Sequence, residues 1–283
     1  MAKLPLNPSR LVEAWKEVSA QTAGSAGITL AGDPRLVGLA QEQFSPGGTV
    51  PATWVGPVAR SAESSSAPGE LLVVLVPPEG EADARSALEQ ARPKGGAVIV
   101  VDEGSEATGK TTYLGQGCTR LSFSDTLAGW RQVFEACMRA AGSHAAALGR
   151  RYPTLRDAAA RQVTYRTAGQ NGLVGLVFFL PGADMPAMTL NQVKMVLSIA
   201  SIYGEAIDRE RAVELAGILG MGFGLRALAR SIVKSTPGIG WAIKAVTGYS
   251  ATMAMGLGAI RYFEKGAPAS TSQVVALAGS LKR

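Results

Sequence analysis

The sequence predicts an α/β domain followed by an all-α domain: a domain built on a small sheet, then a C-terminal helical bundle. In the first half, continuous apolar runs such as LLVVLV and AVIVV alternate with amphipathic helical stretches, as in parallel sheets buried on both faces. After residue 143 no strand pattern remains. The charge changes at the same place: residues 1–143 hold 12 basic and 15 acidic residues, whereas residues 144–283 hold 16 and 7.

The elements of the first half follow from local patterns. A helix is expected over 9–22, where Ser9 can cap it, and a buried strand over 28–32. Asp33 and Pro34 then start a helix that reaches 44, as cap and first residue. Further strands are expected at 71–76, 97–101 and 119–123, with one short strand within 52–58, and further helices at 80–95 and 124–142.

The second half consists of helical, glycine-rich and apolar stretches, which include 189–204, 210–235 and 241–266. The expected organisation is an N-terminal helix (1–24), a degenerate GTPase-like α/β domain (25–143), a Gly/Ala-rich helical domain (144–266) and a flexible tail (267–283).

The composition excludes several kinds of chemistry. The only histidine is His144 and the only cysteines are Cys118 and Cys137, so a His/Cys zinc site lacks ligands. No cluster of carboxylates suited to acid–base catalysis is evident. We expect no catalytic residue, no metal and no cofactor, and the N-terminus lacks the apolar core of a secretory signal.

One set of residues in the helical half forms a recognisable pattern: Leu180, Pro181, Asp184, the run from Asn191 to Met195, Tyr203, Gly204, Arg211, Glu214, Pro237, Arg261, Tyr262 and Phe263. Through these residues the helical half resembles domain-of-unknown-function family 697, a helical module found in bacteria behind small GTPase domains or membrane anchors. The resemblance implies a membrane-associated or GTPase-associated module without known catalysis.

The first half looks like a GTPase domain that has lost its nucleotide motifs. ITLAGD stands where such a domain has its first strand and phosphate loop, but DPRLVGLAQ follows, without Gly-Lys-Ser/Thr. Where the Asp-x-x-Gly of the second switch is expected, residues 76–80 read VPPEG. Where the guanine-reading Asn-Lys-x-Asp is expected, residues 100–103 read VVDE. We therefore expect a small Rossmann-like or GTPase-like sheet domain that is a pseudo-GTPase, and the missing motifs favour a protein without enzymatic activity.

One string does match a phosphate loop: Gly104, Gly109, Lys110 and Thr111 fit the pattern G-x-x-x-x-G-K-[ST]. If it binds, Lys110 would neutralise the outer phosphates and Thr111 would hold magnesium. A strand pattern follows where the chemistry needs a helix, and Glu106 would repel phosphate. The alternatives are an NTP-binding switch that takes a nucleotide with magnesium, or a surface loop.

Basic residues beside apolar stretches predict contact with anionic lipid, with a solvated helix face as the alternative. The residues concerned are Arg150, Arg151, Arg156, Arg161, Arg226, Arg230 and Lys234. Close helix packing is expected at glycines in the last helices: Gly217, Gly220, Gly222, Gly224, Gly256 and Gly258. The charge-free windows 167–183, 212–225 and 245–260 are shorter than a spanning helix needs, so a peripheral or hairpin-inserted attachment is expected.

The leading hypothesis is a non-catalytic scaffold or regulator at the cytoplasmic face of the membrane. Its expected partners are anionic membrane lipid, an unidentified protein and a second copy of the chain that packs through the glycine-rich helices. Nucleic acid is disfavoured because aromatic residues for base stacking are sparse among the arginines. A soluble helical interaction domain without lipid affinity is the third hypothesis.

Overall fold

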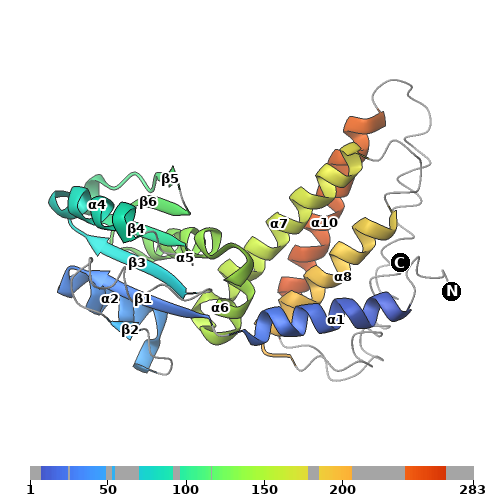
Figure 1. The fold of residues 1–283 in the computed structure, drawn as a ribbon, viewed down its shortest axis with the longest axis horizontal. Helices are drawn as coiled ribbons and strands as arrows, with labels where there is room; N and C mark the ends of the chain where they lie inside the picture. Colours follow the sequence, from blue (N-terminus) through green and yellow to red (C-terminus); the bar gives the residue numbers. More distant parts are fainter. Residues whose placement is uncertain are drawn as a thin grey trace.

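The computed structural model describes residues 8–24, 26–48, 53–54, 70–91, 96–115, 117–177, 185–205 and 240–265. It places a sheet with its helices at one end and a group of long helices at the other (Figure 1). The predicted fold class, α/β followed by helices, is confirmed. The predicted tail and the predicted helix at 210–235 lie outside the described residues.

The sheet has six strands in the order β2-β1-β3-β4-β6-β5. The strands are β1 (Gly27–Gly32), β2 (Thr53–Trp54), β3 (Glu70–Val76), β4 (Ala97–Asp102), β5 (Thr111–Gly115) and β6 (Cys118–Phe123). Every pair is parallel except β5 with β6, which is antiparallel. The five parallel strands follow the doubly wound order 2-1-3-4-5, in which the winding reverses between β1 and β3.

Helices cover both faces of the sheet. On one face lie α2 (Pro34–Phe44) and α5 (Leu127–Ala141), which pack on the side chains of β1, β3, β4 and β6. On the other face α4 (Glu81–Ala91) packs through Ala84 and Leu88. The apolar runs form strands because both faces bury their side chains: Leu71 to Leu75 are all fully buried.

Three long helices form the other end of the molecule. A short helix α6 (Ala145–Arg151) leads from α5 to α7 (Arg156–Val177), which runs away from the sheet. Helices α8 (Met185–Ile202) and α10 (Gly240–Glu264) pack against α7 and against each other. Pro153 separates α6 from α7, since proline starts a helix but cannot continue one.

The hydrophobic core does not divide at residue 143. One continuous cluster of buried side chains runs from Leu30 and Val73 in the sheet, through α5 and α6, to Ile199 in α8 and Phe263 in α10. The change from sheet to helices near residue 143 is therefore a change in secondary structure around a shared core.

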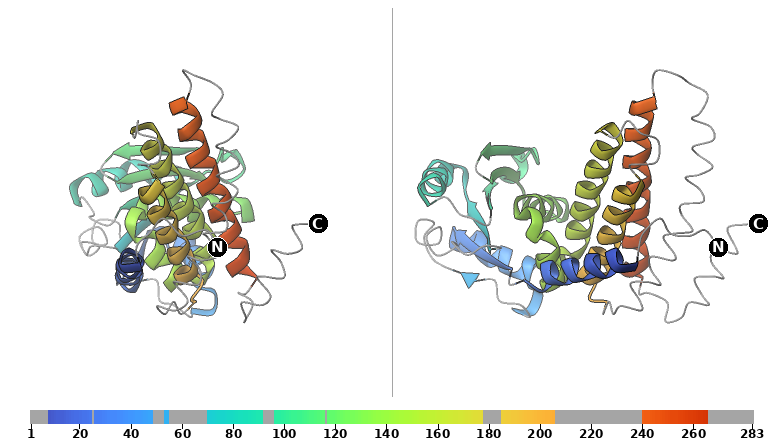
Figure 2. Two further views of the ribbon diagram at one scale, coloured as in Figure 1. Left: turned by 90° about the vertical axis from the view of Figure 1, so that its right-hand side faces the viewer. Right: turned by 45° about the vertical axis from the view of Figure 1, so that its right-hand side comes forward.

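The N-terminal helix α1 (Pro8–Ala23) packs against α8 and the short helix α6, far from it in the sequence (Figure 2). Its buried stripe is Ala14, Val18 and Thr22, spaced four residues apart. Thr22 Oγ1 lies 3.0 Å from Ser201 Oγ in α8, and Glu17 forms an ion pair with Lys194. The predicted separate helix is thus part of the helical half.

Candidate functional site

The site to test first is the carboxyl edge of the sheet between β1 and β3, where doubly wound sheets bind their ligands. Here β1 and β3 approach so closely that a Cβ on Gly32 would lie 2.0 Å from the carbonyl oxygen of Leu75. The Asp33 amide donates a hydrogen bond of 2.8 Å to the same oxygen. Gly32 and Leu75 are partners in the β1–β3 ladder, so this edge is held by strand pairing and only glycine fits at the end of β1.

The connection from β1 to α2 leaves no room for a phosphate loop. It consists of a single residue, Asp33, between Gly32 of the strand and Pro34 of the helix. The Asp33 carboxylate accepts hydrogen bonds from the amides of Arg35 (3.0 Å) and Leu36 (3.1 Å). These first-turn amides are the groups that would hold a phosphate, and the chain's own carboxylate occupies them.

A salt bridge joins the start of α2 to the end of β4. Arg35 Nη2 lies 2.9 Å from Asp102 Oδ2, and the other oxygen of Asp102 accepts the Gly104 amide at 3.2 Å. The arginine is largely exposed while Asp102 is mostly covered. Asp102 therefore orders the turn after β4, and its oxygens are used within the fold.

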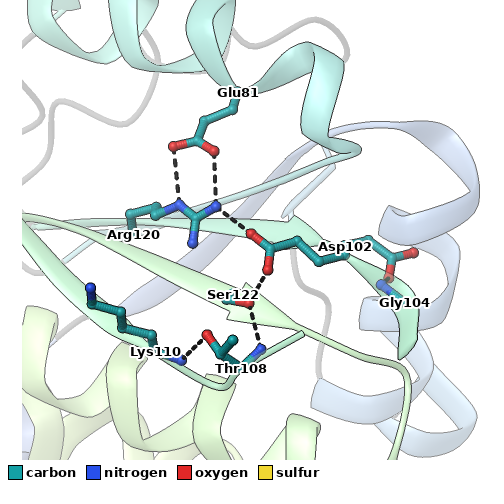
Figure 3. A network of polar contacts seen from close by, with 8 residues as sticks. Glu81, Asp102, Gly104, Thr108, Lys110, Arg120 and Ser122 are labelled. Carbon is teal, nitrogen blue, oxygen red and sulfur yellow. Dashed lines mark hydrogen bonds and ion pairs between the residues drawn. The ribbon is translucent and has the colours of Figure 1, made fainter. Parts of the chain in front are cut away.

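A second polar network lies on the α4 side of the sheet and is centred on Arg120 (Figure 3). Arg120 donates two hydrogen bonds of 3.0 Å to Glu81, in the first turn of α4, and a further bond to Glu103. The Ser122 hydroxyl also donates to Glu103 and accepts the Thr108 amide at 3.0 Å.

The network keeps its groups charged. Hydrogen bonds from Ser122 and Arg120 hold the pKa of Glu103 below its ordinary value, and the bonds to Glu81 and Glu103 raise the pKa of Arg120. A carboxylate held ionised in this way is a poor proton donor or acceptor at neutral pH. The arrangement ties α4 to β4 and β6, which is a structural task.

The Gly104–Thr111 string does not have the geometry of a phosphate loop. Gly104 begins a single 3-10 turn that ends at Glu106, and Thr111 begins strand β5, where a phosphate loop needs a helix. The Lys110 carbonyl accepts the Ser122 amide at 3.0 Å, so the segment already belongs to the sheet. Strand β5 was not predicted. Lys110, the residue that would neutralise phosphate, lies just before β5, which is an edge strand of the sheet.

The predicted lipid-binding arginines of the junction are engaged within the fold. Arg150 donates to the Ser201 hydroxyl at 3.2 Å. Arg151 donates to the Ala26 carbonyl at 2.8 Å and its guanidinium lies 5.8 Å from the centre of the Tyr152 ring. Arg161 forms a two-bond ion pair with Asp157, with distances of 2.8 and 3.0 Å.

Arg156 has a buried Nε atom without a hydrogen-bond partner in the described part of the chain. Arg151 thus ties α6 to the residue before β1 and Arg150 ties α6 to α8, whereas Arg161 is paired within α7. Arg226, Arg230 and Lys234 lie outside the described residues. The sequence shows that the arginines are there but not where their side chains point, because partners such as Ala26 and Ser201 are distant in the sequence.

The glycine predictions had mixed outcomes. A Cβ on Gly256 would lie 2.3 Å from Thr164 of α7, so close packing at Gly256 is confirmed. The prediction for Gly258 is wrong, because it faces outward and a Cβ there would meet nothing within 4 Å. The unpredicted Gly248 lets α10 approach the Asn171 carbonyl. The remaining positions lie outside the described residues: Gly217, Gly220, Gly222 and Gly224.

A polar network that was not predicted lies inside the helical half. Asn171 of α7 donates to Thr252 of α10 (2.9 Å) and to the Met188 carbonyl of α8 (3.3 Å), and it accepts from Asn191 at 2.9 Å. Gln192 also donates to Thr252 at 2.8 Å. Asn171 and Thr252 are completely buried, and Gln192 nearly so. The network joins all three long helices.

None of the helices within the described ranges has the length and hydropathy needed to cross a membrane. The 245–260 window is part of α10, whereas 212–225 and the end of 167–183 lie outside those ranges. In the same ranges, the His, Cys, Asp and Glu side chains form no group of three or more that could hold a metal ion.

No protein-family model matches the chain, and neither the curated proteins nor the solved structures contain a match. The resemblance to domain-of-unknown-function family 697 therefore stays a prediction.

Proposed function

We propose that the protein is a non-catalytic scaffold or regulator. Its sheet half is a pseudo-GTPase-like domain that binds another protein, and its helical half holds it peripherally at the cytoplasmic face of a membrane. The observation that carries the non-catalytic part is the Asp33 carboxylate on the amides of Arg35 and Leu36.

The Asp33 cap argues against a nucleotide in two ways. A bound phosphate would have to displace the Asp33 carboxylate, which stabilises the helix start by about 1 kcal/mol. The negative charge of that carboxylate would also repel the phosphate. The connection between β1 and α2 is the single residue Asp33, which also leaves no loop that could wrap around a phosphate chain. The sheet is thus suited to presenting surfaces, not to turning over a nucleotide.

Titration with fluorescent GTP and ATP analogues, with and without magnesium, tests the non-catalytic part. We expect no saturable binding by the wild-type protein, and no difference between it and Lys110→Ala. Saturable, magnesium-dependent binding that Lys110→Ala abolishes would instead establish the NTP switch at the Gly104–Thr111 string.

Fractionation of the expressed protein tests the membrane part. We expect the protein in the membrane fraction and its release by alkaline carbonate, because no described helix is long and apolar enough to span a bilayer. Retention through carbonate would make it an integral protein. Recovery only in the soluble fraction would overturn the membrane part and favour the soluble interaction domain.

A further inference from the structure

Strand β5 ends the sheet and pairs with a neighbouring strand on one side only. It is the last strand in the order β2-β1-β3-β4-β6-β5, and Figure 1 shows it as the outermost strand, beyond β6. Its first three residues, Thr111, Thr112 and Tyr113, are all exposed, and Tyr113 is 70% exposed. Successive side chains of a strand point to opposite faces, so the strand is uncovered on both faces as well as at its edge.

The ladder with β6 decides which main-chain groups of β5 point to this open edge. The Ser122 amide of β6 donates to the Lys110 carbonyl, and in an antiparallel ladder bonded pairs alternate with non-bonded pairs. By this alternation Thr112 turns its N–H and C=O groups toward β6. The N–H and C=O groups of Thr111 and Tyr113 are therefore directed to the open edge.

The open edge lacks the features that usually prevent a further strand from pairing. Natural edge strands are often blocked by proline or by charged side chains, and residues 111–119 contain neither. The register with β6 shifts between Tyr113 and Gly115, which confines regular pairing to the first three residues of β5. The edge is thus suited to a short, uncharged, extended segment.

We propose that β5 pairs antiparallel with β5 of a second copy of the chain, so that the two sheets continue across a twofold axis. Thr112 lies at the axis, opposite Thr112 of the second copy. Thr111 of each copy lies opposite Tyr113 of the other. In this register the outward N–H and C=O groups of both strands find partners. The inference goes beyond the proposed function, which concerns a membrane and a different protein.

The side chains of β5 favour a second copy as the occupant. Threonine beside threonine, and threonine beside an aromatic residue, are cross-strand pairs that stabilise antiparallel strands. Lys110, the charged residue just before β5, would lie opposite Leu114 of the second copy. The two Lys110 side chains would then stand at opposite ends of the paired segment. Identical strands therefore meet without like charges opposite each other, in the symmetry that is commonest among homo-oligomers.

Sedimentation velocity of the full-length protein over a concentration series tests the inference. The paired segments are short, so we expect a monomer–dimer equilibrium with a dissociation constant on the order of 10 µM. Thr112→Lys and Thr112→Glu each place two like charges opposite each other at the axis. Each variant alone should weaken the dimer at least about tenfold. An equimolar mixture of the two should dimerise at least as tightly as the wild-type protein, because the charges are then opposite.

The matched controls are Leu127→Lys and Leu127→Glu, which make the same charge changes at an exposed position outside β5. Alone or mixed, they should change the dissociation constant less than about twofold. Urea unfolding of each variant shows whether the monomer keeps its fold.

A disulfide provides a readout that needs no new charge. Residues opposite each other in a non-bonded antiparallel pair have Cα atoms about 4.5 Å apart, within the range that a disulfide spans. With oxidised glutathione, we expect a covalent dimer of Thr112→Cys. Neither Leu127→Cys nor the wild-type protein should form one, since the natural Cys118 is half-buried and Cys137 is buried.

Each contrary outcome overturns the inference and leaves the proposed function to its own tests. A wild-type protein that stays monomeric up to about 100 µM, with no disulfide in Thr112→Cys, would show that β5 does not pair with itself. A dimer that both Thr112 charge variants leave unchanged would have its interface elsewhere, for example in the helical half. A dimer that each variant weakens, but that the mixture does not restore, would contradict the twofold register at Thr112.

Discussion

The two halves of the molecule place their largest polar networks differently. In the sheet half, side chains such as Leu30, Val73 and Ile99 fill an apolar interior, and the ion pairs of Arg35 and Arg120 lie at the margin. In the helical half, Asn171, Gln192 and Thr252 lie inside, and Val246 and Tyr249 lie outside.

The difference follows from what aligns the strands in one half and the helices in the other. Parallel strands are aligned by main-chain hydrogen bonds, so their side chains can be interchangeable aliphatic groups. Helices have no main-chain bonds to each other, and their relative positions depend on side chains that must find particular partners. The network around Asn171 provides such partners for α7, α8 and α10.

The largest expected effect is at the end of β1, in the sheet half. Gly32→Ala should lower the free energy of unfolding by about 4 kcal/mol, because the new Cβ would collide with the Leu75 carbonyl and Gly32 has a φ of 114°. The measurement is urea unfolding. Gly47→Ala is the control: its φ is also positive, but a Cβ meets nothing within 4 Å, so it should cost only about 1 kcal/mol. Equal losses would contradict the main-chain contact.

The interior of the helical half is tested by Asn171→Ala, which should cost about 3 kcal/mol. The substitution leaves a cavity and removes the bonds to Thr252, Asn191 and the Met188 carbonyl in a buried place. Thermal and urea unfolding measure the loss. The neighbouring, exposed Gln170→Ala should change stability by less than about 0.5 kcal/mol. A loss below about 1 kcal/mol for Asn171→Ala would mean that the network does not align the helices.

The margin of the sheet half is tested by Arg120→Met, with an expected loss of about 2 kcal/mol at neutral pH. Because the folded pKa of Glu103 is lowered, its stabilisation is present above its unfolded pKa and disappears as the pH falls through the folded pKa. The difference between wild type and Arg120→Met should therefore shrink below about pH 4.

The matched control for Arg120 is Arg85→Met, which removes an exposed pair with Glu89 in α4. It should cost less than about 0.5 kcal/mol at any pH. If the Arg120→Met difference stays constant from neutral to acidic pH, the ion pairs are not its cause.

The smallest effect compares two glycines on opposite sides of α10. Gly256→Ala should cost about 1 to 2 kcal/mol, because its Cβ would press on Thr164. Gly258→Ala should raise the free energy of unfolding by about 0.5 to 1 kcal/mol, since alanine favours the helix and nothing opposes the new Cβ. The same sign for both would contradict the orientation of α10.

Local patterns were sufficient for most elements. The runs LLVVLV and AVIVV are β3 and β4, and the predicted cap Asp33 does cap α2. Strand β5 could not be predicted because its Thr-Thr-Tyr segment is half of a pairing whose register depends on β6. The absence of phosphate-loop motifs and the capping of α2 by Asp33 were both evident from the sequence.

The sequence by itself determined most of the described helices and strands, the lack of the GTPase motifs and the excess of basic charge after residue 143, because each depends on neighbouring residues. Only the tertiary structure decided where those charges and small residues point. Arg151 reaches a carbonyl on Ala26 and Thr22 reaches Ser201, across separations that no local pattern encodes. Likewise, Gly256 and Gly258 are alike in sequence and lie on opposite sides of α10, because side-chain direction rotates around a helix and only its neighbours define an inside.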